Sequence, residues 1–300
     1  MTRRDVDHLR AIAGKLRSLS DPCVLCPRRC GARREAGEKG ICGEDGTLRL
    51  GGYSLHRGEE PPLSGRDPET GREGSGTVFV SGCSLRCLYC QNGAISQGGL
   101  GFPADPERLG EIFLELQARG ARNVNWVTPG HALPALVAGL AAARERGFAL
   151  PVVYNSSGYE RPEVLVLLEG IVDVYLMDLR YAVPLSARAG SRAPDYPEAN
   201  RAALRESFRQ VGAFRESYYR GLIVRHLMLP GRLEETRTAL EFIAWDLSPS
   251  VPVSLMNQYA PKHRAVGDPE WGRAVDPADY ARAVEILDRL GLTEGWTQEE

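Results

Sequence analysis

The residues best suited to do chemistry in this 300-residue chain are its seven cysteines, which fall into two tight clusters. In chain order they are Cys23, Cys26, Cys30, Cys42, Cys83, Cys87 and Cys90. A disulfide framework usually distributes an even number of cysteines through an exported chain. An odd number in two groups, with none after Cys90, instead predicts metal binding in a reducing compartment.

The three later cysteines lie in GCSLRCLYCQN, with the spacing C-x3-C-x2-C, directly after the β-rich run 77–81. Three thiolates on one loop can bind three irons of a four-iron cluster, which leaves the fourth iron without a protein ligand. An open metal position is typical of catalytic rather than structural sites. The alternative is a structural zinc knuckle, a Cys3His site for which His131 could supply the fourth ligand.

The four earlier cysteines, with the spacing C-x2-C-x3-C-x11-C, can complete one tetrahedral site on their own. Zn²⁺ would fit such a site, and so would an auxiliary [4Fe–4S] cluster. Gly31, Gly40 and Gly43 permit the tight turns and N–H···S contacts that a metal knuckle needs. Zinc would give a structural role, whereas a cluster would give an electron relay to the later cysteines, and the sequence leaves both open.

Strand-like and helix-like segments alternate from Thr77 to the end of the chain. The expected strands are 77–81, 123–128, 151–154, 171–179, 222–229 and 251–256, and the expected helices are 106–119, 133–146, 162–169, 198–211, 234–245 and 279–290. About six βα units predict an α/β fold, a partial (β/α)6 TIM-type barrel over residues 77–300. Residues 1–50 are expected to form a helix and the four-cysteine lobe, and residues 51–76 a turn-rich connector.

The three-cysteine loop and several segments around it resemble one enzyme superfamily. The pattern C-x3-C-x-aromatic-C, with Tyr89 as the aromatic residue before Cys90, is that of the radical S-adenosylmethionine (SAM) superfamily. Further segments, within a resemblance that runs from Cys23 to about His263, are similar to its branch related to pyruvate formate-lyase activating enzyme. They include EEPPLSG (59–65), NVNWVTPGH (123–131), VVYNSSGY (152–159), VYLMDLR (174–180), DYPEANR (195–201), GLIVRHLMLPG (221–231) and SLMNQYAP (254–261).

The resemblance implies that Cys83, Cys87 and Cys90 hold a [4Fe–4S] cluster whose open iron is chelated by SAM. An electron from the cluster then cleaves SAM to methionine and a 5′-deoxyadenosyl radical, which abstracts hydrogen from a substrate. The chain is thereby expected to be an oxidoreductase of the activating-enzyme type, served by an electron donor such as flavodoxin or ferredoxin. Its substrate would be a backbone glycine of a partner protein, another protein residue or a small molecule, because fold and family do not decide between these.

Four arginines crowd the four-cysteine lobe. They are Arg28, Arg29, Arg33 and Arg34. Small electron carriers of the expected kind are usually acidic, so these arginines could form a docking face for one of them. The alternative is an ordinary solvated loop.

Polar residues at the carboxyl ends of the expected strands are candidates to bind SAM, because ligands lie at that edge of a parallel barrel. The candidates are Tyr89, Asn92, Asn125, Thr128, Asn155, Ser157, Asp178, Arg225 and Gln258. Arg225 or Arg180 would pair with the SAM carboxylate through its planar fork. Many relatives bind the SAM amino group with a GGE-type stretch after strand two. Here TPGH (128–131) has no acidic residue, so backbone carbonyls, Thr128 and Asn125 are expected to replace it.

No single residue beyond the cysteines is identified as catalytic. The candidates are Glu59, Glu60, His131, Asp178, His226 and Tyr259. Glu59 and Glu60 precede the expected barrel, where they could cover its mouth and meet the substrate, and the long crossover after strand four could act as a lid. Each candidate has an ordinary alternative as a turn former, an ion pair, a solvated charge or a buried structural histidine.

The bulk composition excludes several classes of protein. A net charge of −2 gives no basic footprint for nucleic acid, which disfavours an RNA-modifying enzyme. No apolar run approaches the roughly 18 residues of a membrane span, and the N-terminus lacks the apolar core of a signal peptide, so a cytoplasmic location is expected. The competing hypothesis is a non-catalytic iron–sulfur or zinc protein for electron transfer or scaffolding; Tyr89 and the polar strand ends favour the enzyme.

Overall fold

The computed structural model describes residues 3–298 and contains two compact units. Unit 1 consists of the chain up to Ser84 together with Ala94–Ser156 and Glu160–Asp173. Unit 2 consists of Leu85–Gly93, Ser157–Tyr159 and the chain from Val174 onward. Each unit has its own strands and helices, so the two are described in turn.

Unit 1 is a sheet whose strands follow the order β3-β1-β2-β4-β5. The strands are β1 (Arg49–His56), β2 (Ser75–Val80), β3 (Phe102–Pro103), β4 (Val124–Val127) and β5 (Val152–Ser156). β2, β4 and β5 run parallel, while β1 is antiparallel to both β2 and β3. The helices are α1 (Arg3–Ser18), α4 (Pro106–Ala118) and α5 (Leu133–Glu145), with the short α2 (Pro61–Ser64), α3 (Gly93–Ser96) and α6 (Pro162–Leu165).

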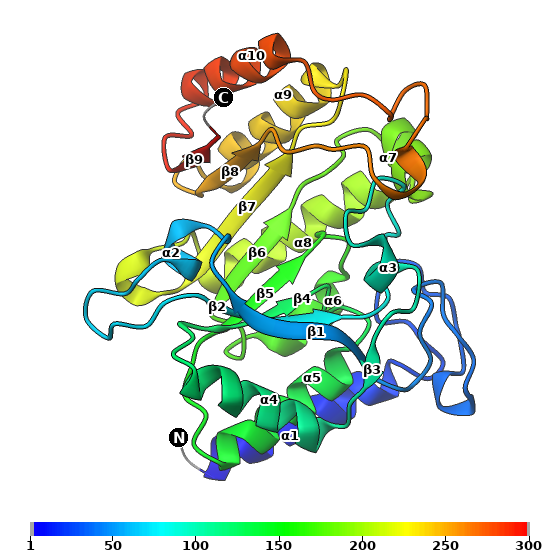
Figure 1. The fold of residues 1–300 in the computed structure, drawn as a ribbon, viewed down its shortest axis with the longest axis vertical. Helices are drawn as coiled ribbons and strands as arrows, with labels where there is room; N and C mark the ends of the chain where they lie inside the picture. The colour runs from blue at the N-terminus through cyan, green and yellow to red at the C-terminus, as the bar shows by residue number, and fades with distance from the viewer. Residues whose placement is uncertain (1–2, 299–300) are drawn as a thin grey trace. The chain divides into compact units, whose positions relative to one another are not determined.

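The helices of unit 1 begin and pack for identifiable reasons. α4 begins where the Asp105 side chain accepts a hydrogen bond from the N–H of Arg108 at 2.7 Å, with Pro106 in the first turn. α4 and α5 pack closely at Gly139, where an added Cβ would lie only 2.7 Å from the Leu109 side chain. α1 lies along α5, and α4 contacts β1, β2 and β4 (Figure 1). These contacts tie the N-terminal helix to the strands that precede the cysteine loop.

Unit 2 has four parallel strands in the order β6-β7-β8-β9. They are β6 (Val174–Asp178), β7 (Gly221–Leu227), β8 (Val253–Met256) and β9 (Gly295–Thr297). The helices are α7 (Pro184–Ser191), α8 (Tyr196–Val211), α9 (Leu233–Phe242) and α10 (Pro277–Arg289), and a π-helical segment, Ile243–Leu247, continues α9. β6 is buried along its whole length, which explains its unbroken apolar run before Asp178.

The predicted α/β class is confirmed, and the barrel is open: within residues 3–298, neither unit closes its strands into a ring. The expected helices from residue 106 onward are present, and α7 is an addition in the long segment after β6. The helix expected at 162–169 is the short α6 followed by a 3-10 turn, Val166–Leu168. The segment 51–76, which was expected to consist of turns, begins with most of β1. The sequence did not indicate this strand because Gly51 and Gly52 are residues that strands disfavour.

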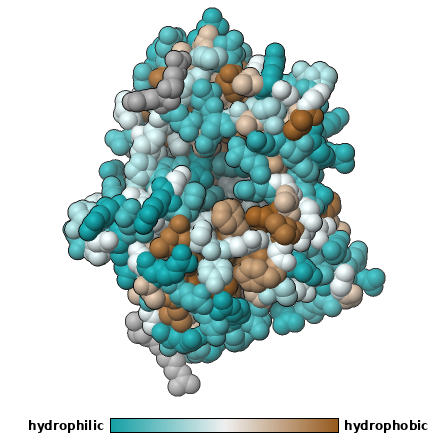
Figure 2. Space-filling model, in the orientation of Figure 1, coloured by the Kyte–Doolittle hydropathy of each residue, from teal (hydrophilic) through white to brown (hydrophobic). Residues whose placement is uncertain are grey.

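The visible face of the molecule is mostly hydrophilic, with apolar side chains gathered over β1 of unit 1 (Figure 2). Leu100 and Phe102, which lie just before and within β3, are exposed. No helix of the described residues combines the length and the apolar character that crossing a bilayer requires.

Gly76 sets how closely β2 approaches β4. A Cβ on Gly76 would lie 2.6 Å from the carbonyl oxygen of Asn123, which belongs to the backbone and cannot swing aside. We expect Gly76→Ala to lower the free energy of unfolding by about 2 kcal/mol, measured in urea. Gly14→Ala is the control, because an added methyl in the middle of α1 meets nothing within 4 Å. That variant should gain about 0.5–1 kcal/mol from helix propensity, and equal effects of the two changes would contradict this account.

Candidate metal centres and cofactor site

The four-cysteine segment of unit 1, residues 23–42, is called the knuckle below, and backbone N–H groups point at its sulfurs. The donor lies two residues after each cysteine: Leu25 for Cys23, Arg28 for Cys26, Ala32 for Cys30 and Glu44 for Cys42. Burial raises the pKa of Cys26 to about 12, and the bond from its N–H donor opposes that shift. Against the effect of burial, the pKa of Cys30 is lowered by N–H donors. Donors placed in this way stabilise thiolates, the form of cysteine that binds metal.

The knuckle sulfurs are neighbours. The side chains of Cys23 and Cys30 are hydrogen-bonded to each other, and a Cβ on Gly40 would lie 3.2 Å from Cys30 Sγ and 3.4 Å from Cys42 Sγ. Among residues 3–298, no three His, Cys, Asp or Glu side chains already surround one point as metal ligands. The shared sulfur neighbourhood and the repeated N–H donors nevertheless fit a metal centre, which would draw the sulfurs around itself on binding.

Arg34 is a buried cation beside the knuckle. Its Nη1 donates to the carbonyl oxygen of His131 at 2.7 Å, and its Nε is buried without a hydrogen-bond partner. It forms no ion pair with a carboxylate of the described residues. Burial raises the pKa values of Cys23 and Cys42, and the guanidinium of Arg34 partly offsets this. A buried charge is costly, and Glu44 is a carboxylate that interacts with the charge of Arg34. The negative charge of metal-bound thiolates would balance Arg34 further, which is a second reason why the knuckle fits a metal.

Only two of the four arginines that could form a docking face are exposed. Arg34 is buried, and Arg28 is half-buried with its Nε donating to the carbonyl oxygen of Ser84 at 3.0 Å. Arg29 and Arg33 are exposed, and Arg33 lies 3.6 Å from a carboxylate oxygen of Glu38. The basic surface of the knuckle is therefore smaller than the sequence predicts, because Arg28 and Arg34 point inward and bind backbone carbonyl groups of unit 1.

The knuckle is hydrogen-bonded to the start of the three-cysteine loop. The N–H of Cys83 donates to the carbonyl oxygen of Cys42 at 3.1 Å, and Arg28 reaches the next residue, Ser84. Gly82 lies just before them with φ +82°, and a Cβ there would come 3.0 Å from the carbonyl oxygen of Cys42. Glycine is required at this position because of both its φ and this close approach. The knuckle and the first cysteine of the loop thus form one connected piece of unit 1.

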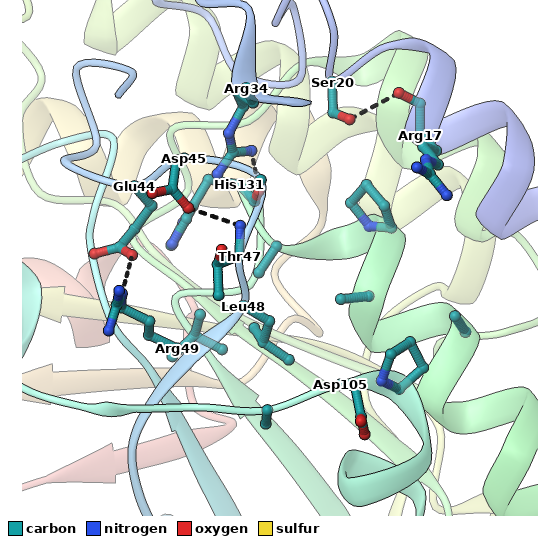
Figure 3. Close-up of a pocket in the computed structure, with 18 of the residues that line it drawn as sticks. Arg17, Ser20, Arg34, Glu44, Asp45, Thr47, Leu48, Arg49, Asp105 and His131 are labelled. Carbon is teal, nitrogen blue, oxygen red and sulfur yellow. Dashed lines mark hydrogen bonds and ion pairs between the residues drawn. The ribbon is translucent and has the colours of Figure 1, made fainter. Parts of the chain in front are cut away.

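His131, the fourth ligand of the zinc alternative, is buried at the wall of a cavity of about 870 Å³ in unit 1 (Figure 3). Its Nε2 donates to the carbonyl oxygen of Ser81 at 2.7 Å. Burial, followed by the nearby charge of Arg34, lowers its pKa to about 4, so it is neutral at ordinary pH. Nε2 is engaged with the backbone and is not available to ligate a metal in this arrangement. Glu44 and Arg49, whose charged groups lie 3.8 Å apart, line the same cavity.

In unit 2, two side chains donate to the sulfur of Cys87. Arg180 Nη1 lies 3.3 Å and Ser191 Oγ 3.1 Å from Cys87 Sγ. Asp178 holds Arg180, because its Oδ2 accepts from Nε at 2.8 Å and from Nη2 at 2.5 Å. Cys87 is buried, whereas Cys90 is half-buried. Donors on sulfur fit a thiolate that ligates an iron–sulfur cluster.

Tyr89, the aromatic residue of the loop, lies in a buried aromatic cluster of unit 2. Its ring stacks on Trp271 at 5.5 Å with an interplanar angle of 13° and lies 5.3 Å from the ring of Tyr259. Tyr259 donates its hydroxyl to the carbonyl oxygen of Trp271 at 2.7 Å, and burial raises its pKa to about 12. The guanidinium of Arg232 covers the ring of Trp271 at 4.0 Å. These contacts hold the second half of the loop in place within unit 2.

The model of the radical SAM superfamily matches residues 77–243, from β2 through α9, and includes the whole three-cysteine loop. This chain belongs to the radical SAM superfamily. The family implies an enzyme with a [4Fe–4S] cluster and SAM. The donors on Cys87 fit the cluster, and the residues that would hold it are Cys83, Cys87 and Cys90.

Two curated relatives of this radical SAM protein come from Methanocaldococcus jannaschii. The uncharacterized protein MJ0674 is 28% identical over 284 residues, which cover 90% of this chain and 75% of that protein. The uncharacterized protein MJ0808 is 28% identical over 176 residues, 53% of this chain and 49% of that protein. Among solved structures, native anSMEcpe with bound AdoMet has a TM-score of 0.48 at 13% identity. The match spans 70% of this chain and 57% of that one, which is less than two thirds of its length.

Of the expected SAM-binding residues of unit 1, Thr128 and Asn155 lie at or near the carboxyl ends of β4 and β5, whereas Asn125, expected after the strand, is the second residue of β4. Asn125 Nδ2 donates to Glu59 Oε1 at 3.2 Å, and the Oδ1 of Asn125 is buried without a partner. Thr128 has φ +59°, which residues other than glycine rarely adopt, and its N–H donates to the carbonyl oxygen of Asn155 at 2.9 Å. Glu60 is buried at the start of α2. Strained backbone of this kind is common at functional sites, which suits a radical SAM enzyme.

The expected residues of unit 2 differ in their surroundings. His226 is buried, with Nδ1 2.7 Å from the carbonyl oxygen of Leu179 and Nε2 3.0 Å from Thr236 Oγ1. Burial lowers its pKa to about 4, so it is a neutral histidine with both nitrogens engaged. Asp178 is engaged with Arg180, while Asn92 and Gln258 are exposed and Ser157 and Arg225 are partly exposed.

Glu160 is a buried carboxyl group that no motif in the sequence marks. It abuts Gly130 of the TPGH turn so closely that a Cβ there would overlap its carboxylate, and Ser156 Oγ donates to Glu160 Oε1 at 2.5 Å. Burial raises the pKa of Glu160 to about 7. The turn after β4, which has no acidic residue of its own, therefore receives one from just after β5.

Glu160 should make the stability of this protein depend on pH. Below pH 4.5 its carboxyl is protonated in the folded and the unfolded chain alike, and between pH 4.5 and about 7 only the unfolded chain ionises. Folding stability therefore falls as the pH rises through that window, and the penalty is constant above it. Glu160→Gln keeps an acceptor for Ser156 and removes the titration. We expect the free energy of unfolding of Glu160→Gln to rise relative to that of wild type by about 2–3 kcal/mol as the pH goes from about 5 to 8, measured in urea.

The control for this measurement is Glu69→Gln, a carboxyl in an exposed loop. Its unfolding is measured over the same range of pH. A difference between Glu160→Gln and wild type that did not change with pH would show that Glu160 ionises normally in the folded protein.

Proposed function

We propose that this protein cleaves SAM reductively at a [4Fe–4S] cluster held by Cys83, Cys87 and Cys90, and that the resulting radical abstracts hydrogen from a substrate. The observation that carries the proposal is the loop itself, which places three cysteines directly after β2 and has Arg180 and Ser191 donating to its middle sulfur. Membership of the radical SAM superfamily supports it. When bound, the cluster would supply one low-potential electron and an open iron for the amino and carboxylate groups of SAM.

The chain's own residues would bind, orient and shield the reacting groups. Asn155 would supply an amide group near the end of β5, where its carbonyl oxygen accepts from the N–H of the strained Thr128, and Asn125 would supply one from within β4. The fork of Arg180 is bound by Asp178, so we retain Arg225, in β7, as the candidate for the SAM carboxylate. The aromatic cluster around Tyr89 would keep water from the loop.

We further infer that the enzyme is an oxidoreductase of the activating-enzyme type. The support for this finer role is the set of segments similar to the branch of pyruvate formate-lyase activating enzyme, among them EEPPLSG (59–65) and VYLMDLR (174–180). The substrate would then be a glycine of a partner protein. A small molecule with an equally accessible C–H bond is the second class that the same chemistry would serve.

We infer that the knuckle holds a second metal centre, either zinc or an auxiliary iron–sulfur cluster. The repeated N–H donors and the buried Arg34 support a centre with negatively charged ligands. The hydrogen bond from Cys83 to Cys42 gives the centre a structural role toward the three-cysteine loop in either case. A cluster would in addition pass electrons to the catalytic one.

We infer that the electron donor is a small acidic carrier of the flavodoxin or ferredoxin kind. The exposed Arg29 and Arg33 on the knuckle support this partner by charge complementarity. We infer that the protein works in a reducing cytoplasm, because its seven cysteines fall into two groups with metal-site spacing and none of the described ones forms a disulfide.

The proposed reaction is tested by anaerobic reconstitution with iron and sulfide, followed by dithionite and SAM, with 5′-deoxyadenosine measured by mass spectrometry. We expect wild type to form this product and C83A/C87A/C90A to form none, because the open iron needs its three thiolates. Unfolding curves of the variant confirm that its fold survives. If cluster-loaded wild type forms no product, the non-catalytic iron–sulfur or zinc protein becomes the better account.

The same triple variant isolates the knuckle for metal analysis. After reconstitution it should retain one metal centre per chain, about four irons with sulfide or about one zinc. Adding C26S and C30S should remove that metal, because two of the four ligands are then lost. A triple variant that retains no metal after reconstitution would sink the proposal of a second centre.

A further inference from the structure

The sulfur of Cys87 receives donors from two different elements of unit 2. Arg180, just after β6, places Nη1 3.3 Å from Cys87 Sγ, and Ser191, the last residue of α7, places Oγ 3.1 Å from it. Cys87 is only 4% exposed, so bulk water hardly reaches this sulfur. Neither Arg180 nor Ser191 belongs to the loop, so both donors reach the sulfur from segments far from it in the sequence.

Both donors are held in place by further hydrogen bonds. The Arg180 guanidinium gives Nε and Nη2 to Asp178 Oδ2, which directs Nη1 at the sulfur, and the N–H of Arg180 donates to Tyr196 Oη at 3.0 Å. The hydroxyls of Ser191 and Tyr181 lie 2.7 Å apart in a hydrogen bond. The arrangement is therefore built into the interior of unit 2 and does not depend on mobile surface side chains.

We propose that Arg180 and Ser191 set the reduction potential of the cluster through Cys87, with Asp178 as the counter-charge that moderates Arg180. This inference rests on the proposed function, because it requires Cys87 to be a cluster ligand. All three are positioning residues that act through the sulfur.

The sign of the effect follows from charge. Reduction adds one electron to the cluster, taken from a low-potential one-electron carrier, and needs no proton. The added negative charge spreads onto the sulfur ligands, so donors at about 3 Å stabilise the reduced form more than the oxidised form. Removing a donor should therefore make reduction harder. Removing the carboxylate of Asp178 leaves the guanidinium uncompensated and should make reduction easier.

The test is an EPR-monitored redox titration of the reconstituted full chain without SAM, on the signal that changes when SAM is later added. Arg180→Gln should lower the equilibrium constant for reduction by about tenfold, about 59 mV for a one-electron couple. Ser191→Ala should lower it by about threefold, and Asp178→Asn should raise it. Arg205→Gln is the control, because Arg205 pairs with Asp246 on the exposed surface of the same unit.

Lower values for R180Q and S191A together with a higher value for D178N support the inference, since general damage to the site would shift all three the same way. Shifts no larger than that of R205Q, or a D178N shift in the direction of R180Q, overturn it. If R180Q fails to retain a cluster, the opposite signs of S191A and D178N decide the question in the same manner. A wild type without any SAM-responsive signal would instead refute the proposed function itself, which separates the two failures.

Discussion

Negatively charged sulfur is stable away from water only when fixed donors or positive charge replace its hydration, and this constraint shapes both units. In the knuckle the replacement is mainly backbone, because each sulfur receives an N–H from two residues further on, with Arg34 as the buried cation. At Cys87 the side chains of Arg180 and Ser191 also supply donors. Backbone donors persist whatever side chain is present, whereas side-chain donors can be exchanged one at a time.

That difference suits different roles for the two cysteine groups. A knuckle whose donors come from the backbone keeps its character through sequence change and can serve as a fixed support. A sulfur whose donors are side chains has surroundings that single substitutions can adjust. The cysteine loop thus combines a first residue, Cys83, anchored by backbone to Cys42 with a second, Cys87, whose surroundings are adjustable.

The fold class and the cysteine groups could be predicted because their signals are local. The spacing of cysteines needs only neighbouring residues, and a strand buried on both faces such as β6 is visible as an apolar run. β1 was not predicted from the sequence, because its two glycines weaken the strand pattern and its pairing with β2 and β3 is decided by tertiary contacts. The position of Arg34 escaped for a similar reason: among four arginines close in sequence, only packing determines which one is buried.

The candidate site shows the same division. Motif residues such as Tyr89 could be named from the sequence, but the partners that define their surroundings could not, because they lie far away in the chain. Ser191, Trp271 and Glu160 have no motif, and each matters through one contact with a distant residue: Cys87, Tyr89 and Gly130. Conversely, His226 has the residue type of a catalytic group but is neutral and engaged at both nitrogens.

The hydrogen bond from the N–H of Cys83 to the carbonyl oxygen of Cys42 affects how oxygen would inactivate the protein. If the knuckle holds the proposed second metal centre, oxidation of its thiols would expel that metal, and the stretch that carries Cys42 would then lose the support that the metal gives it. Cys83, the first cysteine of the neighbouring loop, is hydrogen-bonded to that stretch. Oxidation at the knuckle would therefore disturb the position of Cys83 before the three-cysteine loop was itself oxidised. The rate at which air inactivates the protein would then be set by whichever of the two cysteine groups is oxidised first.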